Sequence, residues 1–159
     1  MLIKDSLNIM NKKILSIETA SNICSVGLFN NKKLISMKED SNRKHSSLLA
    51  LFVKEIFEDE KSSLNSLDAI ALSIGPGSYT GLRIGLSFAK GIAFSLKKPI
   101  IPVDTMETLN NSIEDTDYFI VLSAYKDYFY IQEYRNREKY KSTIFDKIDK
   151  IKNTKTVYG

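Results

Sequence analysis

Residues 73–86 of the chain read SIGPGSYTGLRIGL, and this stretch decides the fold. It begins with a tight glycine–proline turn, which ends the apolar strand expected over residues 69–74. Ser78 and Thr80 are both good N-cap residues for a helix that runs to about Leu96. The stretch therefore predicts a buried strand, a tight turn and a helix in direct succession.

Small residues recur at every fourth position of this expected helix. They are Gly81, Gly85, Ala89 and Ala93, and the spacing places them on one face. Glycine inside a helix costs roughly 1 kcal/mol relative to alanine, so the stripe needs a reason. The simplest reason is close approach of another backbone, from this chain or from a partner. We expect a partner, because the stripe offers more small surface than one internal crossing needs.

A glycine-rich turn before a helix also suggests a phosphate-binding loop, because free N–H groups and the helix dipole attract anions. The phosphate-loop pattern places a lysine and then Ser or Thr after its last glycine, whereas Leu82 and Arg83 follow Gly81 here. The dinucleotide-binding pattern is also not met, since no acidic residue follows at the required distance in a strand. Residue chemistry alone favours a tight turn with close helix packing.

Hydrophobic periodicity predicts the element order β-β-β-α-β-α-β, followed by a weaker α-β-β. The strong elements are strands over 13–18, 23–29 and 33–37, a helix over 48–59, a strand over 69–74, a helix over 80–96 and a strand over 100–103. The weaker strands cover 118–124, 128–134 and 155–159.

Three antiparallel strands that lead into alternating helix and strand are typical of an actin-like or ribonuclease H-like (ASKHA) lobe. We therefore predict an α/β fold with a mixed sheet over residues 10–105, preceded by a flexible extension over residues 1–9. Residues 106–159 would form an abbreviated second lobe. Met10 is a second candidate start of the chain, beside Met1.

Composition fits a soluble globular protein, with 43% hydrophobic and 26% charged residues. No window approaches the roughly twenty apolar residues of a membrane span, and polar residues interrupt the N-terminus where a secretory signal would be apolar. Cys24 is the single cysteine, so an internal disulfide is excluded and a buried core position is favoured. We predict a cytoplasmic protein without a membrane segment.

Residues 126–159 hold nine basic and five acidic residues, which accounts for the whole formal net charge of +4. A basic tail suggests RNA binding, and neighbouring aromatic residues could stack on bases. The alternative is an ordinary solvated face, which we favour because no RNA-binding fold signature is present. The candidate stacking residues are Tyr125, Tyr128, Phe129 and Tyr130, and the alternating basic residues are Arg135, Arg137, Lys139 and Lys141.

The segment 75–85 (GPGSYTGLRIG) resembles the signature of the bacterial TsaB (YeaZ) family. The resemblance runs colinearly from about Lys13 to Leu109 and includes ILSIETA at 14–20, CSVGL at 24–28, RKHS at 43–46 and KPIIPV at 98–103. Members of this family are accessory subunits of the machinery that makes threonylcarbamoyladenosine at position 37 of ANN-decoding tRNA. The resemblance thus implies an actin-like fold and a role in tRNA modification.

The resemblance also implies that no residue here is catalytic, metal-binding or cofactor-binding. The related catalytic subunit TsaD carries a metal-binding His-x-x-x-His pair, and the matching positions are Thr105 and Leu109. The phosphate turn of actin-like ATPases matches residues 18–21, which retain the acid Glu18 but contain no glycine. His45, the only histidine, precedes the first helix, where a helix-start or packing role is favoured over a catalytic triad. Where relatives often show Asp-Ala-Arg, this chain has Ser-Ala-Tyr at 123–125.

By this resemblance the chain would be a scaffold that binds a TsaD-like catalytic subunit and forms a homodimer when that partner is missing. A TsaE-like ATPase would join the assembled pair, and tRNA would be reached mainly through the complex. We predict an interface made by the helices over 46–59 and 80–96. Its residues are Leu48, Phe52, Gly81, Leu82, Gly85, Leu86, Ala89 and Ala93.

Two alternatives from other classes stay open. One is an enzyme of the actin-like superfamily, either a peptidase or a small-molecule kinase. One histidine, no cluster of metal-ligand residues and no intact phosphate turn argue against it. The other is a general RNA-binding module that uses the basic tail.

Overall fold

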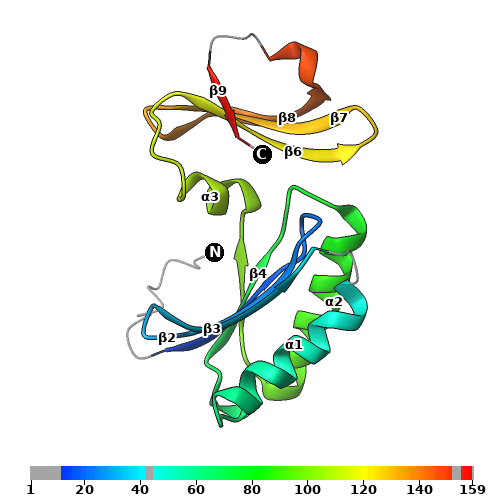
Figure 1. Cartoon of the computed structure of the whole chain (residues 1–159), viewed down its shortest axis with the longest axis vertical. Coiled ribbons are helices and arrows are strands. Elements are labelled where there is room, and N and C mark those ends of the chain that lie inside the picture. The colour runs from blue at the N-terminus through cyan, green and yellow to red at the C-terminus, as the bar shows by residue number, and fades with distance from the viewer. Residues whose placement is uncertain (1–11, 42–44, 152–154, 159) are drawn as a thin grey trace.

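In the computed structural model the chain forms two lobes, each built on one β-sheet (Figure 1). The structure describes residues 12–41, 45–151 and 155–158, so the extension expected over residues 1–9 lies outside the described residues. In the described part, the first sheet has the strand order β3-β2-β1-β4-β5 and the second has the order β8-β7-β6-β9. Helices join and cover the strands of the first sheet, which confirms the predicted α/β layout.

The first sheet is mixed, as the sequence predicts. Its strands are β1 (Lys13–Glu18), β2 (Cys24–Asn30), β3 (Lys33–Asp40), β4 (Ala69–Ser73) and β5 (Ile100–Val103). β1, β2 and β3 pair antiparallel, and β4 and β5 continue the sheet in parallel from β1. Asn31 and Lys32 have φ angles of 52° and 65°, so they form the tight turn of the predicted hairpin between β2 and β3.

Two helices cover one face of this sheet, α1 (His45–Asp59) and α2 (Tyr79–Leu96) (Figure 1). The buried residues of α1 recur at helical spacing and include Phe52 and Ile56. α2 begins after Ser78, whose Oγ accepts a hydrogen bond from the Gly81 N–H at 3.2 Å, and it ends at Lys97 in the left-handed region. The core between helices and sheet includes Leu15, Ile17, Val26, Leu28, Leu49, Phe57, Ile70 and Leu72.

Cys24 belongs to this first core and is fully buried. Burial, and secondarily the charge of Asp40, raises the pKa of the Cys24 thiol. A raised pKa keeps the thiol protonated and unreactive. The structure therefore agrees with the predicted core position.

The second sheet consists of β6 (Tyr118–Tyr125), β7 (Tyr128–Arg135), β8 (Glu138–Lys147) and β9 (Thr156–Tyr158). β6, β7 and β8 form antiparallel hairpins, and β9 pairs in parallel with β6. The short helix α3 (Thr105–Asn110) lies between the lobes (Figure 1). Two single 3₁₀ turns, η1 (Leu64–Ser66) and η2 (Ile148–Lys150), complete the described elements.

A second, smaller core joins α3 to the second sheet. Its buried residues are Met106, Ile113, Tyr118, Ile120 and Tyr134. The rings of Tyr118 and Tyr134 stack with centroids 5.2 Å apart, and the Tyr134 hydroxyl donates to the Glu107 carboxylate at 3.4 Å. The lobes thus have separate cores, and α3 belongs to the second.

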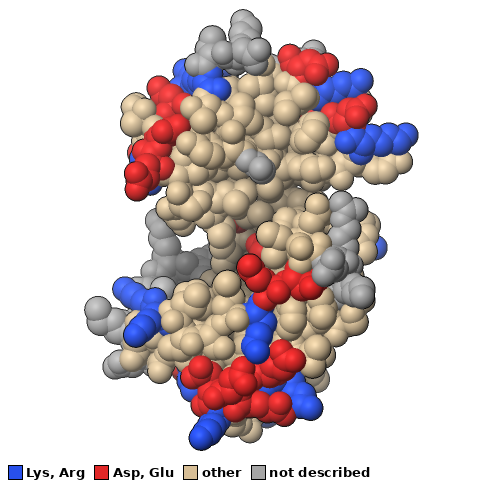
Figure 2. All heavy atoms as spheres, in the orientation of Figure 1, with Lys and Arg blue, Asp and Glu red and all other residues tan. Residues whose placement is uncertain are grey.

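Charged side chains of both signs lie beside one another on the view in Figure 2, most densely at the end of the first lobe. In the first lobe, Lys38 pairs with Glu55 at 3.5 Å and with Asp59 at 3.1 Å, and Lys54 pairs with Glu58 at 3.7 Å. Among the described residues, no helix has the length and apolar character needed to cross a membrane.

Candidate functional site

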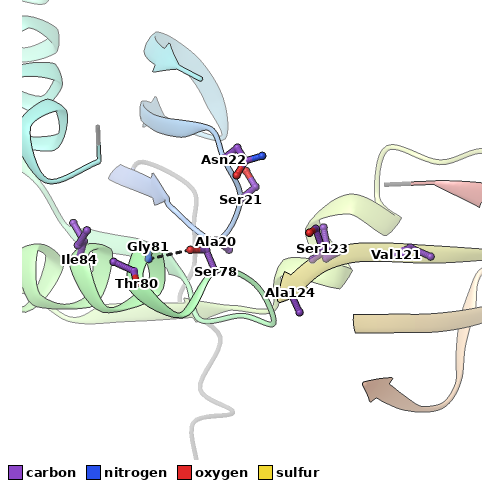
Figure 3. A pocket seen from close by; sticks show the side chains of 11 residues that line it. Ala20, Ser21, Asn22, Ser78, Thr80, Gly81, Ile84, Val121, Ser123 and Ala124 are labelled. Carbon is purple, nitrogen blue, oxygen red and sulfur yellow. Dashed lines mark hydrogen bonds between the residues drawn. The ribbon is translucent and has the colours of Figure 1, made fainter. Parts of the chain in front are cut away.

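A pocket of about 470 Å³ lies between the two lobes (Figure 3). The first lobe lines it with the turn after β1 (residues 20–22) and with the start of α2 (residues 78–84). The second lobe lines it with residues 121–124 of β6. Ser123 and Ala124, two of the three residues singled out at 123–125, therefore lie at this pocket.

No ionisable side chain lines this pocket within the described part of the chain. Its polar groups are the side chains of Ser21, Asn22, Ser78, Thr80 and Ser123. The start of α2 contributes the positive end of a helix dipole, but one of its free N–H groups, that of Gly81, is already capped by Ser78 (Figure 3). The pocket thus lacks charged groups that could balance a nucleotide triphosphate or carry a proton.

The start of the turn after β1, at Thr19, is covered by α2. Thr19 is fully buried at this turn, and its Oγ1 has no hydrogen-bond partner among the described residues. A methyl group at Gly81 would overlap the Thr19 carbonyl oxygen, and one at Gly85 would overlap the Thr19 hydroxyl. The two glycines therefore allow α2 to lie directly on this turn.

The stripe of small residues on α2 thus packs inside this chain. Gly81, Gly85, Ala89 and Ala93 are all buried, and a methyl group at Gly85 would also come within 3.3 Å of Leu72 in β4. Our expectation that these four residues face a partner is therefore wrong. The need for close backbone approach was inferred correctly, but the approaching backbone is the turn after β1.

Glu18 is the acidic residue in the segment 18–21, which the resemblance matches to the phosphate turn of actin-like ATPases. Its carboxylate accepts a hydrogen bond from the Ala20 N–H, two residues further along the same turn. The acid thus holds the shape of the turn after β1.

The positions that match the metal ligands of TsaD lie in α3. Thr105 is buried at the first residue of this helix, and Leu109 packs against the second core. The side chain of Asp104 caps the helix, accepting from the N–H groups of Met106 at 2.8 Å and Glu107 at 3.3 Å. No group of three His, Cys, Asp or Glu side chains suited to a metal occurs among the described residues. The side chain of His45 lies outside that description.

The other predicted interface residues divide between core and surface. Leu48 is half-buried and Phe52 buried, and both pack in or against the first core. Leu82 is half-buried, and Leu86 is 38% exposed on the outer side of α2. Leu86 is therefore the predicted residue that the structure leaves most open to a partner.

Sequence reasoning missed larger exposed side chains on the same outer surface. On α2, Tyr79 is 67% and Phe94 is 88% exposed, and Leu51 on α1 is 45% exposed. Tyr79, Leu86 and Phe94 are separated by seven and eight residues, so they project from one side of the helix, within about a quarter turn of one another. Helical spacing could have found them had the exposed side of the helix been traced.

A groove of about 650 Å³ lies between α1 and α2. Apolar side chains line most of it, among them Val53, Phe57, Leu64, Phe88 and Ile92. The outer surface of the helix pair, defined by Leu51, Tyr79, Leu86, Phe94 and this groove, is called the helix-pair surface below. It is a candidate site for docking another apolar surface.

The fold and the pocket define a class: a two-lobed protein of the actin-like type, with a pocket between lobes that lacks charged lining residues. A family model described as TsaD, tRNA N6-adenosine threonylcarbamoyltransferase, matches residues 33–157. The solved structure described as YeaZ from Pseudomonas aeruginosa superposes with a TM-score of 0.74 at 21% identity, covering 90% of this chain and 70% of that one. This superposition supports the fold.

Curated relatives identify the family more closely. A "tRNA threonylcarbamoyladenosine biosynthesis protein TsaB" of Buchnera aphidicola from Acyrthosiphon pisum is 33% identical over 133 residues, 80% of this chain and 60% of the relative. The protein of that name from Escherichia coli K12 is 37% identical over 97 residues, 61% of this chain and 42% of the relative. The chain belongs to the TsaB (YeaZ) family, and it spans about half the length of these curated relatives.

Proposed function

We propose that this chain is a non-catalytic scaffold subunit in the biosynthesis of threonylcarbamoyladenosine, at position 37 of ANN-decoding tRNA. It binds and supports a TsaD-like threonylcarbamoyltransferase. Its relatives' names supply the pathway, and the helix-pair surface is the observation that carries the scaffold role. Exposed apolar side chains on one side of a helix are a feature of surfaces that dock to another protein.

Three features support a role without chemistry of its own. The pocket between the lobes is lined by uncharged residues, and the Glu18 carboxylate is engaged by the N–H of Ala20. At the positions of the metal-binding histidines stand Thr105, which is buried, and Leu109, which packs in a core. Neither side chain offers a nitrogen ligand to a metal ion.

The helix-pair surface suits a helical partner. Phe94 and Leu86 would bury apolar area at about 25 cal/mol per Å², and the groove between the two helices would receive side chains of a partner helix. Arg83 lies over the Tyr79 ring at 4.1 Å from its centroid and places a cation on this surface. A polar rim around an apolar centre is the usual anatomy of such interfaces.

Co-purification tests this role. The chain is co-expressed with the tagged TsaD-like protein of its own organism, and the double variant Leu86→Glu, Phe94→Glu is compared with the natural chain. Two carboxylates in a buried apolar contact should reduce capture at least about tenfold. Ile144→Glu is the matched control, because Ile144 is 49% exposed on β8 of the other lobe. Equal capture of the double variant and the control would contradict the assignment of this surface.

The same surface would form the homodimer in the absence of the partner. Sizing chromatography of the isolated chain should show a dimer that the double variant loses and the Ile144→Glu control keeps. Adding the TsaD-like subunit should replace the dimer by a mixed complex, to which a TsaE-like ATPase then binds. A homodimer that persists in the double variant would place self-association elsewhere.

The enzyme alternative has a direct assay. The isolated chain should neither hydrolyse ATP nor cleave peptides, and it should bind no stoichiometric metal. Turnover by the pure chain that disappears on Glu18→Ala would overturn the non-catalytic assignment.

A further inference from the structure

One face of the second sheet is half covered and half open. α3 covers the half that contains Tyr118 and Tyr134. The open half carries large rings, with Tyr125 68%, Tyr128 38% and Phe145 54% exposed. This open half, defined by Tyr125, Tyr128, Tyr130 and Phe145, is called the aromatic patch.

Strand pairing places the four rings of the patch on the same face. Tyr125 is the cross-strand partner of Tyr128, and Tyr130 is the partner of Phe145. The Tyr128 and Phe145 rings stack with centroids 5.2 Å apart at 13°, and Tyr130 meets Phe145 at 5.4 Å. Leu122, the other cross-strand partner of Tyr130, lines the pocket between the lobes. The patch therefore extends from that pocket outward to β8.

Two exposed lysines flank the rings. Lys126 Nζ lies 5.2 Å from the centroid of Tyr125, and Lys147 Nζ lies 5.8 Å from that of Tyr128. Asp127 adjoins Lys126 in the turn, whereas Asp146 is the cross-strand partner of Phe129 and so belongs to the opposite face of the sheet. Cations thus lie directly beside the stacked rings.

The combination of exposed aromatic rings and lysines distinguishes between two kinds of partner, another protein and a single-stranded nucleic acid. The cores of protein–protein interfaces are depleted of lysine, because burying its charge is costly. Single-stranded nucleic acid accepts the same combination, since bases stack on aromatic rings and phosphates attract lysines. We propose that the aromatic patch binds unpaired nucleotides of an RNA strand, with bases on Tyr128 and Phe145 and phosphates near Lys126 and Lys147. This goes beyond the scaffold role, which leaves RNA contact to the complex.

Fluorescence anisotropy with a short fluorescein-labelled oligoadenylate tests the proposal on the full chain. The natural chain should bind it at low salt, and Tyr128→Ala and Phe145→Ala should each weaken binding about tenfold. Lys126→Ala combined with Lys147→Ala should reduce the slope of log affinity against log salt by about 1.4, since each neutralised phosphate contributes about 0.7. Ile144→Ala is the matched control, because Ile144 is 49% exposed and neighbours Phe145 on β8 but lies on the opposite face of the sheet, so affinity should stay unchanged.

Thermal melting of each variant establishes that it is folded. The double reversal Lys126→Glu, Lys147→Glu changes only exposed side chains and provides a second arm that should abolish binding. Absence of binding by the natural chain, or equal weakening by Ile144→Ala, overturns the proposal. So does a folded patch variant that loses self-association or capture of the TsaD-like partner but keeps its oligoadenylate affinity. Failure of the scaffold role appears separately, as equal capture of the TsaD-like subunit by the Leu86→Glu, Phe94→Glu double variant and its control.

Discussion

The two sheets of this chain differ in how their faces are covered. Two long helices, α1 and α2, cover one face of the first sheet and bury its apolar side chains in a continuous core. Among the described residues, the second sheet is covered by the six-residue helix α3 over part of one face, and large rings stay exposed beside it. The comparison teaches that the first lobe is held by close packing of helix on sheet, whereas the second presents its sheet as a surface.

The two faces of α2 repeat this contrast within one helix. The inner face is made of glycine and alanine and lies on the backbone of Thr19. The outer face carries Tyr79, Leu86 and Phe94, which project from the lobe. Small residues therefore determine how the helix packs inward, and large residues determine what it offers to a partner.

Gly85→Leu should have the largest effect, because no space exists at this position. A side chain there would overlap Thr19, so we expect overpacking to lower the free energy of unfolding by about 1–3 kcal/mol or more. Gly91→Ala is the matched control in the same helix. No atom lies within 4 Å of a methyl group at Gly91, so this change should stabilise by up to about 1 kcal/mol.

Denaturant unfolding of the two variants gives both values, and sizing chromatography on the same samples measures association. A Gly85→Leu variant that is as stable as the natural chain but no longer associates would show that the stripe faces a partner in solution. The close packing inferred for the first lobe would then be wrong.

Asp104→Ala should have a smaller effect, confined to the second lobe. The change removes the cap of α3 and the contact of Asp104 with Lys139 at 3.5 Å, so we expect a loss of about 1 kcal/mol. Hydrogen exchange should accelerate in α3 and β6 and stay unchanged in α1 and α2. Asp104→Asn separates the two causes, because an amide still caps the helix but carries no charge. Faster exchange throughout the first lobe would show that the two cores unfold as one unit.

The first lobe could be predicted almost fully from the sequence, because its strands and helices bury one face each. The expected strand over 13–18 is β1, and the expected cap Ser78 does begin α2. The strand β8 (Glu138–Lys147) was missed, since its charged residues alternate without an apolar period. Pairing with β7 holds this strand in the sheet, and no local sequence pattern predicts such pairing.

The sites were less predictable, because they depend on which surfaces meet. Spacing showed that the stripe containing Gly81 needs close approach of a backbone but could not say whose, since the turn at Thr19 is far away in the sequence. Among the candidate stacking residues, strand alternation places Phe129 on the opposite face from Tyr128 and Tyr130. Phe145, rather than Phe129, belongs to the patch, and it lies on β8, the strand that the sequence did not predict.

Glu133→Gln should have the smallest effect, visible only as a change in pH dependence. The Glu133 carboxylate forms ion pairs with Lys155 and Arg135, at 2.8 Å each. Burial raises the pKa of Glu133, but the hydrogen bonds and charges of these two partners outweigh burial and hold it below its usual value. Because the folded pKa is the lower one, this stabilisation is complete above the unfolded value of about 4.3 and is lost as pH falls through the folded value.

The natural chain should therefore exceed Glu133→Gln in stability by up to about 1 kcal/mol near neutral pH, and the two should converge in acid. Thermal melting as a function of pH measures this difference. Asp68 is the counterpart in the first lobe, where the Lys13 N–H at 2.8 Å is the main cause that lowers its pKa. The stability of Glu133→Gln should thus still fall in part as pH is lowered, because Asp68 remains. Asp68→Asn should remove that part of the pH dependence. A stability difference between the two chains that is the same at all pH values would mean that the charge of Glu133 does not stabilise the second sheet. The contact between Glu133 and Lys155 would then contribute by packing alone.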